Sequence, residues 1–599
     1  MKKTKRIILT LVFLIFLVLE IKRVFSPFIY EFEPAFQEMI ALHHITAGIV
    51  SNKFIPVIAE IDNEKFFHTA HPPLLHIIYA LFYKIFGAKE WVSRIVSLFF
   101  FWTSLFIISR FLSYQERFYF LTICLFLPIS FRLALTTNYE LLSIFFISLF
   151  VFLFERWLKS PSKNSFEIYF VLLLGLLSDW TFYLTIPALF LLHIKQRPAR
   201  NKLLKLFIIE LIFFLLLCFY YWQVAGEVAV FSHSKVRSNP LYLLNSKIYF
   251  EFWSHLKWIL GLPAIILFLI SLIKIITNKS KKLTFNFIWR FWLCFLILLW
   301  LSAGQLLTRH FVYLLYLFPF MGLTFSLTIN SLKQKNLALL IILLSFFAKD
   351  YFGIKHKDAR GYYLAEKLAE IKGVKTCFST SALGTLYFYD KIETVVPVSK
   401  KASFALKNIN FDLLILDLKS PEVKNLTHFI QNILQNYSLL WSFSDFAVYI
   451  KKDLLGNFSY LGCQIDMSGL KNWWESRTEI VWLNNKAYYA IKQPTGWKKI
   501  SFLQLEAPKG KIIFTPAIMR NIFAGKSDGV NFMIISNTKN QFKLLYARFL
   551  NKKPGCPSII SIDSKSKLYF ITEAGPRGDY AWDDACWLEA KICRQEKCE

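Results

Sequence analysis

The chain has 599 residues, of which 55% are hydrophobic and 18% aromatic, and its formal net charge at pH 7 is +30. Its mean hydropathy of +0.43 is too high for a water-soluble protein of this length, and apolar runs of nearly membrane-spanning length recur. The excess of Lys and Arg does not indicate nucleic-acid binding, because these residues lie mainly in short loops between apolar runs, where they set membrane orientation. Composition therefore predicts a polytopic α-helical membrane protein that contacts membrane lipid and no nucleic acid.

The first apolar run follows a basic N-terminus. Residues 1–6 read MKKTKR, residues 7–19 are apolar, and no small-residue cleavage site follows. We interpret this pattern as an uncleaved anchor in the cytoplasmic (inner) membrane, with its N-terminus in the cytoplasm. The loop over residues 20–90, including the polar stretch Tyr30–Gly87, is then expected outside the membrane.

The positions of the basic loops select the remaining topology. A helix over Pro73–Gly87 is shorter than the roughly 20 residues that a span needs and contains His76 and Lys84, so we expect it along the outer membrane interface. This assignment places the basic loops on the cytoplasmic side, as the positive-inside rule requires. It predicts about eleven spans, the first run followed by 91–111, 118–136, 140–155, 166–178, 180–194, 204–222, 257–276, 287–305, 310–329 and 335–348.

Two extracytoplasmic domains are predicted to follow a transmembrane domain of residues 1–350. Residues 351–455 combine an amphipathic helix at 361–371 with strands at 374–379, 411–418 and 446–452, which indicates a small α/β domain. Residues 456–599 contain short strands between turns, which favours a β-sandwich, with strands expected at 510–518, 529–536, 543–551 and 567–575. Five of the nine cysteines lie beyond residue 460, as suits an oxidising compartment.

Two carboxylates follow the first apolar run. Glu31 and Glu33 would lie near the outer membrane surface, where a carboxylate can act as a general base or orient an acceptor. In an extended segment the two side chains point in different directions, so we expect only one of them to serve chemistry. The alternative is that both are solvated or salt-bridged loop residues.

Histidines are concentrated in the same loop. His71 stands in the run HTAHPP at 68–73, where prolines favour a helix start and its exposed N–H groups attract anions such as phosphate. His43 and His44 share a helical stretch and either contact substrate or pack. The spacing of these histidines and His68 fits no compact metal-ligand pattern, so we predict no metal cofactor, although a divalent ion is a weaker alternative.

The predicted topology brings further polar residues to the outer ends of the spans. Arg309 and His310 form a cationic pair there, and an arginine suits bidentate phosphate binding. Glu140, Asp179 and Trp180 reach the same face and could bind sugar or brace the cations. Interfacial anchoring and helix capping are the structural alternatives.

The order of these motifs resembles that of the GT-C glycosyltransferases of the protein mannosyltransferase and aminoarabinose transferase kind (glycosyltransferase family 39). The matching elements are an acid before IALHHITAG, the block HPPLLHIIYALFYKIFGAKEWVSR ending at Arg94, the acids of TTNYE and LSDW, and the late span RHFVYLLYLFPF. The resemblance covers about residues 7–350. Glu33 stands where the family has its catalytic Asp, and Pro34 follows it in place of a second acid.

The resemblance implies a GT-C fold and the transfer of a sugar from a polyprenyl-phosphate donor to an extracytoplasmic acceptor, which is a glycan, lipid or protein, with inversion. Glu33, with Glu31 beside it, would be the catalytic base or acceptor orienter. His71, Arg309 and His310 would bind the donor phosphate. The remaining candidates for substrate contact are Glu140, Asp179, Trp180, His43 and His44.

The β-rich C-terminal part, with Asp528, Gly529, Asp583, Asp584 and Trp587, looks like jelly-roll modules related to carbohydrate-binding domains. It would then either bind glycan or serve as a structural lid. A rival class is a non-enzymatic glycan or lipid transporter, or a glycan-binding assembly protein. A transporter would favour internal repeats and ionisable groups at mid-membrane, whereas this sequence shows no repeat and gathers those groups at one face.

Overall fold

The fold is given by a computed structural model of the full chain. The residues that the structure describes, apart from isolated positions, are 32–46, 48–61, 64–160, 165–229, 246–260, 262–277, 287–309, 311–332, 376–379, 394–397, 412–417, 437–443, 446–451, 463–464, 477–483, 486–492, 500–507, 509–518, 530–538, 541–550, 555–574 and 585–593. The chain divides into two compact units, one of Met1–Ser26 with Glu33–Lys357 and one of Pro27–Phe32 with Asp358–Glu599.

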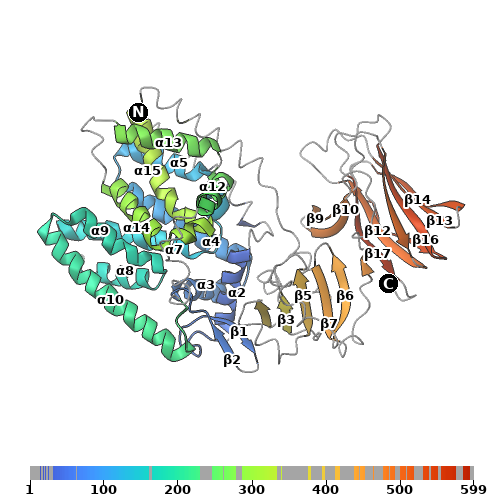
Figure 1. The fold of residues 1–599 in the computed structure, drawn as a ribbon, viewed down its shortest axis with the longest axis horizontal. Helices are drawn as coiled ribbons and strands as arrows, with labels where there is room; N and C mark the ends of the chain where they lie inside the picture. Colours follow the sequence, from blue (N-terminus) through green and yellow to red (C-terminus); the bar gives the residue numbers. More distant parts are fainter. Residues whose placement is uncertain are drawn as a thin grey trace. The chain divides into compact units, whose positions relative to one another are not determined.

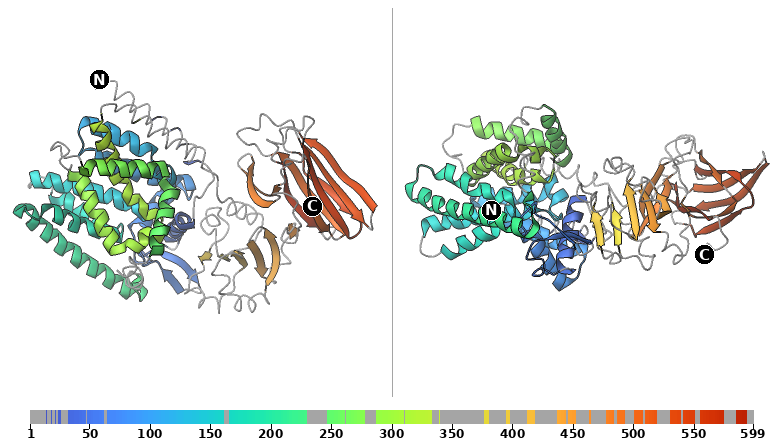
Figure 2. Two further views of the ribbon diagram at one scale, coloured as in Figure 1. Left: turned by 45° about the horizontal axis from the view of Figure 1, so that its top comes forward. Right: turned by 60° about the horizontal axis from the view of Figure 1, so that its bottom comes forward.

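In its described residues the first unit is a bundle of α-helices with two short 3₁₀ helices (η) and one β-hairpin (Figures 1 and 2). Its described helices are α2 (Phe32–Thr46), α3 (Leu74–Phe86), α4 (Glu90–Ser109), α5 (Tyr114–Phe126), α6 (Pro128–Leu133), α7 (Tyr139–Lys159), α8 (Ser165–Leu176), η1 (Trp180–Leu184), α9 (Thr185–His193), α10 (Arg197–Ala225), α12 (Ser246–Leu260), α13 (Leu262–Thr277), α14 (Phe287–Arg309), η4 (Phe311–Tyr316) and α15 (Leu317–Ser331).

Several of these helices have the length and composition of membrane spans. Within the described part of the chain, four are long and apolar enough to cross a bilayer, namely Glu90–Ser109, Tyr139–Lys159, Arg197–Ala225 and Val312–Ser331. Shorter apolar helices accompany them, among them the helix predicted over Pro73–Gly87, which is confirmed as α3. The count of about eleven spans stays a prediction, since nearly all of residues 7–19 and 335–348 lie outside the described residues.

Several boundaries differ from the sequence-based prediction. The span expected over 118–136 is two helices, because Leu127 is extended (φ −60°, ψ 135°) and α6 begins with a proline. The spans expected over 180–194 and 310–329 both begin as 3₁₀ helices. The residues between the spans expected over 204–222 and 257–276 were predicted to form a loop, which is wrong for their second part because α12 already begins at Ser246.

The hairpin of β1 (Val57–Ile61) and β2 (Glu64–Phe67) was not predicted, and it fixes the outer segment between α2 and α3. Buried His43 of α2 donates from Nδ1 to the Ile58 carbonyl oxygen at 2.7 Å, and burial lowers the pKa of this imidazole to about 4. Near the C-terminal end of α10, Tyr221 packs with Ile55 in a small apolar cluster. The hairpin is therefore attached to both α2 and α10.

A buried carboxyl group joins α2 to the helical core. Glu38 is 5% exposed and accepts hydrogen bonds on Oε1 from Ser93 Oγ of α4 at 2.5 Å and from Thr137 Oγ1 before α7 at 2.7 Å. Burial raises the pKa of Glu38 to about 7, although these hydrogen bonds oppose the rise. The two donors fix the register of α2 against α4 and α7.

The described strands of the second unit form a mixed sheet and two antiparallel sheets. The mixed sheet has the order β4 (Thr394–Pro397), β3 (Thr376–Ser379), β5 (Leu413–Asp417), β7 (Phe446–Lys451) and β6 (Tyr437–Phe443), with β3 parallel to β4 and β5. The strands expected at 374–379, 411–418 and 446–452 are confirmed as β3, β5 and β7. The helix expected at 361–371 lies outside the described residues.

The two antiparallel sheets enclose one apolar core around Phe514, Phe532 and Trp587. One sheet has the order β11 (Ile500–Ala507), β16 (Ser566–Ala574), β13 (Val530–Thr538) and β14 (Gln541–Leu550). The other has β15 (Ser558–Ile562), β12 (Gly510–Ile518), β17 (Ala585–Cys593), β10 (Lys486–Lys492) and β9 (Arg477–Leu483), with β8 (Cys463–Gln464) on β17. The four strands expected between 510 and 575 are confirmed as β12, β13, β14 and β16. The domain boundaries near 350 and 455 stay predictions.

The buried Glu38 predicts a specific pH dependence of stability. In the folded protein the Glu38 carboxyl group keeps its proton up to about pH 7, whereas in the unfolded chain the same group loses it near pH 4.5. Protonation of Glu38 therefore stabilises the folded state. As the pH rises from 4.5 to about 7 this contribution to the free energy of unfolding is lost, and the loss is at most on the order of 3 kcal/mol. Glutamine does not titrate, so stability measured by thermal unfolding between pH 4.5 and 7 should depend less on pH in Glu38→Gln than in the wild type. An unchanged slope in the variant would contradict the assignment.

Candidate active site

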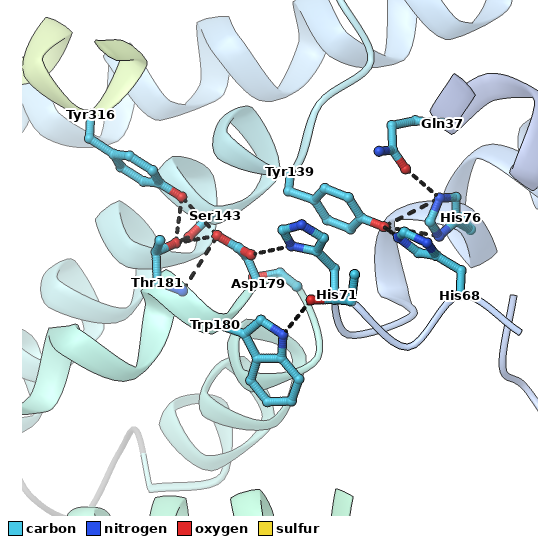
Figure 3. Close-up of polar contacts among 12 residues, drawn as sticks. Gln37, His68, His71, His76, Tyr139, Ser143, Asp179, Trp180, Thr181 and Tyr316 are labelled. Carbon is cyan, nitrogen blue, oxygen red and sulfur yellow. Dashed lines mark hydrogen bonds and ion pairs between the residues drawn. The ribbon is translucent and has the colours of Figure 1, made fainter. Parts of the chain in front are cut away.

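The centre of the site is an ion pair between His71, which precedes α3, and Asp179, which precedes η1. His71 Nδ1 lies 2.9 Å from Asp179 Oδ1 (Figure 3), and the two side chains are 16% and 1% exposed. An ionised carboxylate can only accept hydrogen bonds, so the proton lies on His71 Nδ1. Nε2, which has no hydrogen bond to any described residue, is then the ring nitrogen available to a ligand.

Asp179 is held by hydroxyl groups on its second oxygen. The Tyr316 hydroxyl donates to Oδ2 at 3.1 Å, and the Thr181 hydroxyl donates to the same oxygen. Burial raises the pKa of the Asp179 carboxyl, but the hydrogen bond and charge of His71, with help from the two hydroxyls, outweigh burial and leave this pKa below its ordinary value. Asp179 is therefore ionised at neutral pH despite being buried.

Tyr139, the first residue of α7, covers the other side of His71. Its ring stacks on the imidazole with centroids 4.0 Å apart and an interplanar angle of 14° (Figure 3). Its hydroxyl group is hydrogen-bonded to His68 Nε2 at 3.1 Å and lies 3.3 Å from His76 Nε2. His76 is in turn 2.8 Å from Gln37 Oε1 of α2. Four separate segments thus converge on one polar cluster.

The backbone of the loop that carries His71 is also fixed. Trp180 Nε1 donates to the Ala70 carbonyl oxygen at 2.8 Å, and the Tyr221 hydroxyl of α10 donates to the His71 carbonyl oxygen at 3.0 Å. The Ala229 amide donates to Thr69 Oγ1 at 3.3 Å. These bonds hold the loop against η1 and α10, so the imidazole is oriented by backbone and side-chain contacts together.

Four of the predicted site residues have side chains that the structure does not describe. Glu33 lies in the first turn of α2, four residues before Gln37, so the two share one helix face. Arg309 is the last residue of α14. Glu31 and His310 lie outside the described residues. Their roles stay predictions.

The other predicted residues are described, and three of them gather at the ion pair. Asp179 and Trp180 contact the His71 loop, as above, and Glu140 is buried beside Tyr139 at the start of α7 and interacts electrostatically with Tyr316. His43 is used in the hairpin contact. His44 is fully buried, no described residue is hydrogen-bonded to either of its ring nitrogens, and burial lowers its pKa to about 4.

The sequence analysis missed the residues that support His71. Tyr139 and Tyr316 lie inside the motifs TTNYE and YLLYLFP, and His76 lies five residues after His71. A tyrosine or histidine within an apolar helix does not by itself indicate a functional role. Only tertiary packing brings these tyrosines to the imidazole and the carboxylate.

The described residues provide no obvious metal site. No group of three or more His, Cys, Asp or Glu side chains among them is arranged to hold a metal ion. Burial and the nearby His68 and other imidazoles lower the pKa of His76 well below its ordinary value. The absence of a metal cofactor remains a prediction for the complete chain.

Comparison with known proteins finds matches among solved structures only. No family model and no curated protein matches the chain. The chain is similar to ArnT from Cupriavidus metallidurans bound to undecaprenyl phosphate, with a TM-score of 0.38 and 12% identity over 74% of this chain and 97% of that one. It is also similar to the apo oligosaccharyltransferase of Archaeoglobus fulgidus, with a TM-score of 0.43 and 9% identity over 99% and 98%.

A second structure from the same archaeon is the oligosaccharyltransferase AglB in complex with an inhibitory peptide and a dolichol-phosphate, with a TM-score of 0.42 and 9% identity over 92% of this chain and 93% of that one. ArnT and AglB are GT-C glycosyltransferases, the class that the motifs indicate. Because these TM-scores are low, the functional argument is made from the residues of the site.

The ion pair predicts energetic coupling between His71 and Asp179. His71→Ala and Asp179→Asn should each lower the free energy of unfolding of the purified protein. The loss in the double variant should be smaller than the sum of the losses in the two single variants. The coupling energy expected for such neighbours is about 0.5–3 kcal/mol, measurable by thermal unfolding. His193→Ala, which breaks a similar pair with Glu155 at the other end of α9 (3.2 Å), should combine additively with Asp179→Asn. Additivity between His71 and Asp179 would contradict the pairing.

Proposed function

We propose that the chain is an integral-membrane glycosyltransferase that moves a sugar from a polyprenyl-phosphate-linked donor to an acceptor outside the cytoplasmic membrane, with inversion at the anomeric carbon. The observation that carries this proposal is the His71–Asp179 pair, in which a buried carboxylate orients an imidazole whose Nε2 is available to a ligand. The motif order around His71 and the apolar helices of the same unit support it.

The donor phosphate is the group that this imidazole would serve. During transfer the bond between the anomeric carbon and the phosphate oxygen breaks, and negative charge develops on the departing polyprenyl phosphate. A hydrogen-bond donor that points at that oxygen lowers the activation free energy of transfer. It does so because the negative charge on the oxygen is larger in the transition state than in the bound polyprenyl-phosphate sugar. His71 provides this contact through Nε2–H when its ring is protonated, with Asp179 balancing the charge. Arg309 and His310 are proposed to complete the phosphate site.

The sequence left two roles open for Asp179, namely binding sugar and bracing cationic groups, and we propose that it acts in the second way, on His71. Both of its oxygens are occupied by protein groups, namely His71 on Oδ1 and the hydroxyls of Thr181 and Tyr316 on Oδ2. We therefore assign it to positioning His71 rather than to binding sugar. Glu140 and Trp180, at the adjacent helix ends, remain the proposed sugar and acceptor contacts.

Glu33 is the proposed base. The acceptor hydroxyl or amine attacks the anomeric carbon from the face opposite the phosphate, and its proton passes to the Glu33 carboxylate as the new bond forms. Gln37, on the same face of α2, is hydrogen-bonded to His76 in the cluster that supports Tyr139 and His71. This connection supports the placement of the first turn of α2 at the same site.

A transfer assay tests the proposal. Membranes containing the wild type should transfer label from a polyprenyl-phosphate sugar to an extracytoplasmic acceptor. His71→Ala should lower the transfer rate by about 10²–10³-fold through loss of charge stabilisation, and Glu33→Gln by about 10²–10⁴-fold through loss of the base. Asp179→Asn should also be impaired, because an amide can present its NH₂ group to His71 and favour the wrong tautomer.

His193→Ala is the matched control, because it removes a histidine paired with a carboxylate, Glu155, at the opposite end of α9. It should transfer at the wild-type rate when expressed at equal level. Wild-type activity in His71→Ala would remove His71 from the phosphate site. A wild type that turns over no polyprenyl-phosphate sugar would refute the proposed function itself.

A further inference from the structure

A turn before the β1–β2 hairpin exposes two large apolar side chains. In this turn, residues 48–55, Val50 is 73% exposed and Phe54 is 51% exposed. The turn is closed by backbone hydrogen bonds, among them one from the Lys53 amide to the Val50 carbonyl oxygen at 2.8 Å and one from the Phe54 amide to the Ile49 carbonyl oxygen at 2.9 Å. The two apolar side chains are therefore exposed on an ordered turn rather than on an irregular loop.

The backbone of the turn is strained at two successive residues. Lys53 (φ 52°) and Phe54 (φ 58°) both lie in the left-handed region, which costs a residue other than glycine on the order of 1–3 kcal/mol. A neighbouring contact helps to hold this conformation, because Asn52 Oδ1 accepts a hydrogen bond from Lys65 Nζ of β2 at 2.6 Å. Strained residues are concentrated at functional sites, and the effect of the strain here is to hold the Phe54 ring on the protein surface.

The turn is attached to the C-terminal part of α10. The Tyr220 hydroxyl donates to the Lys53 carbonyl oxygen, and Tyr221 packs with Ile55. Tyr220 borders an apolar stripe along α10, whose members repeat every three or four residues and are all exposed, namely Ile208, Ile212, Leu215, Phe219 and Trp222. Because α10 is long and apolar enough to cross a bilayer, this stripe is a lipid-facing surface, and the turn extends it.

The position of Tyr220 along α10 gives the depth of the turn in the bilayer. With 29 residues the helix is about 43 Å long, whereas roughly 20 residues cross a hydrocarbon core of about 30 Å. Residues 197–205, RPARNKLLK, carry four basic side chains and are therefore expected outside the hydrocarbon. Residues 206–225, in which the single acidic residue, Glu210, is buried, then cross the core. Tyr220 consequently lies about 8 Å inside the boundary at the C-terminal end of the helix.

This depth selects lipid as the occupant of the exposed apolar surface. A segment that is hydrogen-bonded to Tyr220 lies at the level of the acyl chains, so Val50 and Phe54 contact hydrocarbon instead of water. The selection does not rest on charge, since Lys53 is the single charged residue of the turn, and a lysine at this depth extends its amino group to the headgroup layer. Exposed aromatic residues near the end of a span, as on α10, are typical of the same layer.

We propose that residues 48–55 form a membrane-inserted turn in the leaflet that contains the C-terminal end of α10, which is the outer leaflet in the predicted topology. Val50 and Phe54 enter the acyl-chain layer, and the Lys53 amino group lies at the lipid phosphates. The proposal requires α10 to span the membrane, and it does not depend on the transferase function.

Insertion of the turn would also restrict the depth of the His71 loop. Directly after the turn, the Pro56 carbonyl oxygen accepts a hydrogen bond from the His68 amide at 2.7 Å. The turn is thus joined through the short β1–β2 hairpin to the segment that carries His71. A fixed depth of the turn therefore limits the depth at which this imidazole can lie.

Spin labelling of the full chain in lipid nanodiscs tests the proposal. Because the chain has nine cysteines, a genetically encoded nitroxide amino acid replaces Phe54 or, in a second variant, Val50. Collisions with oxygen, which partitions into hydrocarbon, are compared with collisions with a water-soluble nickel chelate. Two exposed positions of α10 serve as references, Ile212 in the apolar stripe for lipid and Asn201 in the basic first part of the helix for water.

We expect the oxygen-to-nickel collision ratio at 54 and at 50 to be several-fold above the ratio at 201. Ratios at both positions no higher than at 201 would overturn the proposal. Labels at both positions that neither reagent reaches would also overturn it, because a protein surface would then cover the turn. A water-like ratio at 212 would overturn it as well, because α10 would then not be a span.

Discussion

The polar core of the first unit depends on one buried charge, the Asp179 carboxylate. An ionised carboxylate without partners at 1% exposure would be strongly destabilising. Here the imidazole of His71 and the hydroxyls of Thr181 and Tyr316 satisfy it. These partners come from the His71 loop, η1 and η4, so satisfying one charge also fixes where these segments meet. The orientation of His71 follows from that constraint.

Contacts with the same cluster of polar residues also position the surrounding helices. Tyr139 stacks on His71 and brings α7 to the site, and the Tyr221 hydroxyl brings α10. Gln37 and Glu38 are adjacent residues of α2. Gln37 is hydrogen-bonded to His76, and Glu38 accepts hydrogen bonds from Ser93 and Thr137. Figure 3 shows two runs of polar contacts, one from Tyr316 through Asp179 to His71 and one from Tyr139 through His76 to Gln37, and the stacking of Tyr139 on His71 joins them. A phosphate-binding imidazole held in this way needs little reorganisation during transfer, which is the main physical advantage of a preorganised site.

The sequence predicts much of the architecture, because membrane spans and buried strands are defined by local apolar pattern. α3, α4, α7 and β13 fall where the pattern places them. The break at Leu127 and the early start of α12 do not, because amphipathic helix and loop are hard to distinguish in an aromatic-rich chain. His71, Asp179 and Trp180 were predictable since polar residues at the ends of apolar runs are conspicuous. Tyr139 and Tyr316 were not, because a tyrosine within an apolar helix has the same appearance whether its hydroxyl group faces lipid or a buried carboxylate.

The most direct test of the account is an experimental structure of the protein in a nanodisc with bound polyprenyl phosphate. The account predicts that a phosphate oxygen lies within hydrogen-bond distance of His71 Nε2, about 2.7–3.2 Å, while Nδ1 keeps its contact with Asp179. A phosphate bound elsewhere, with His71 Nε2 facing only protein, would contradict the central claim that the buried carboxylate orients this imidazole toward the donor phosphate.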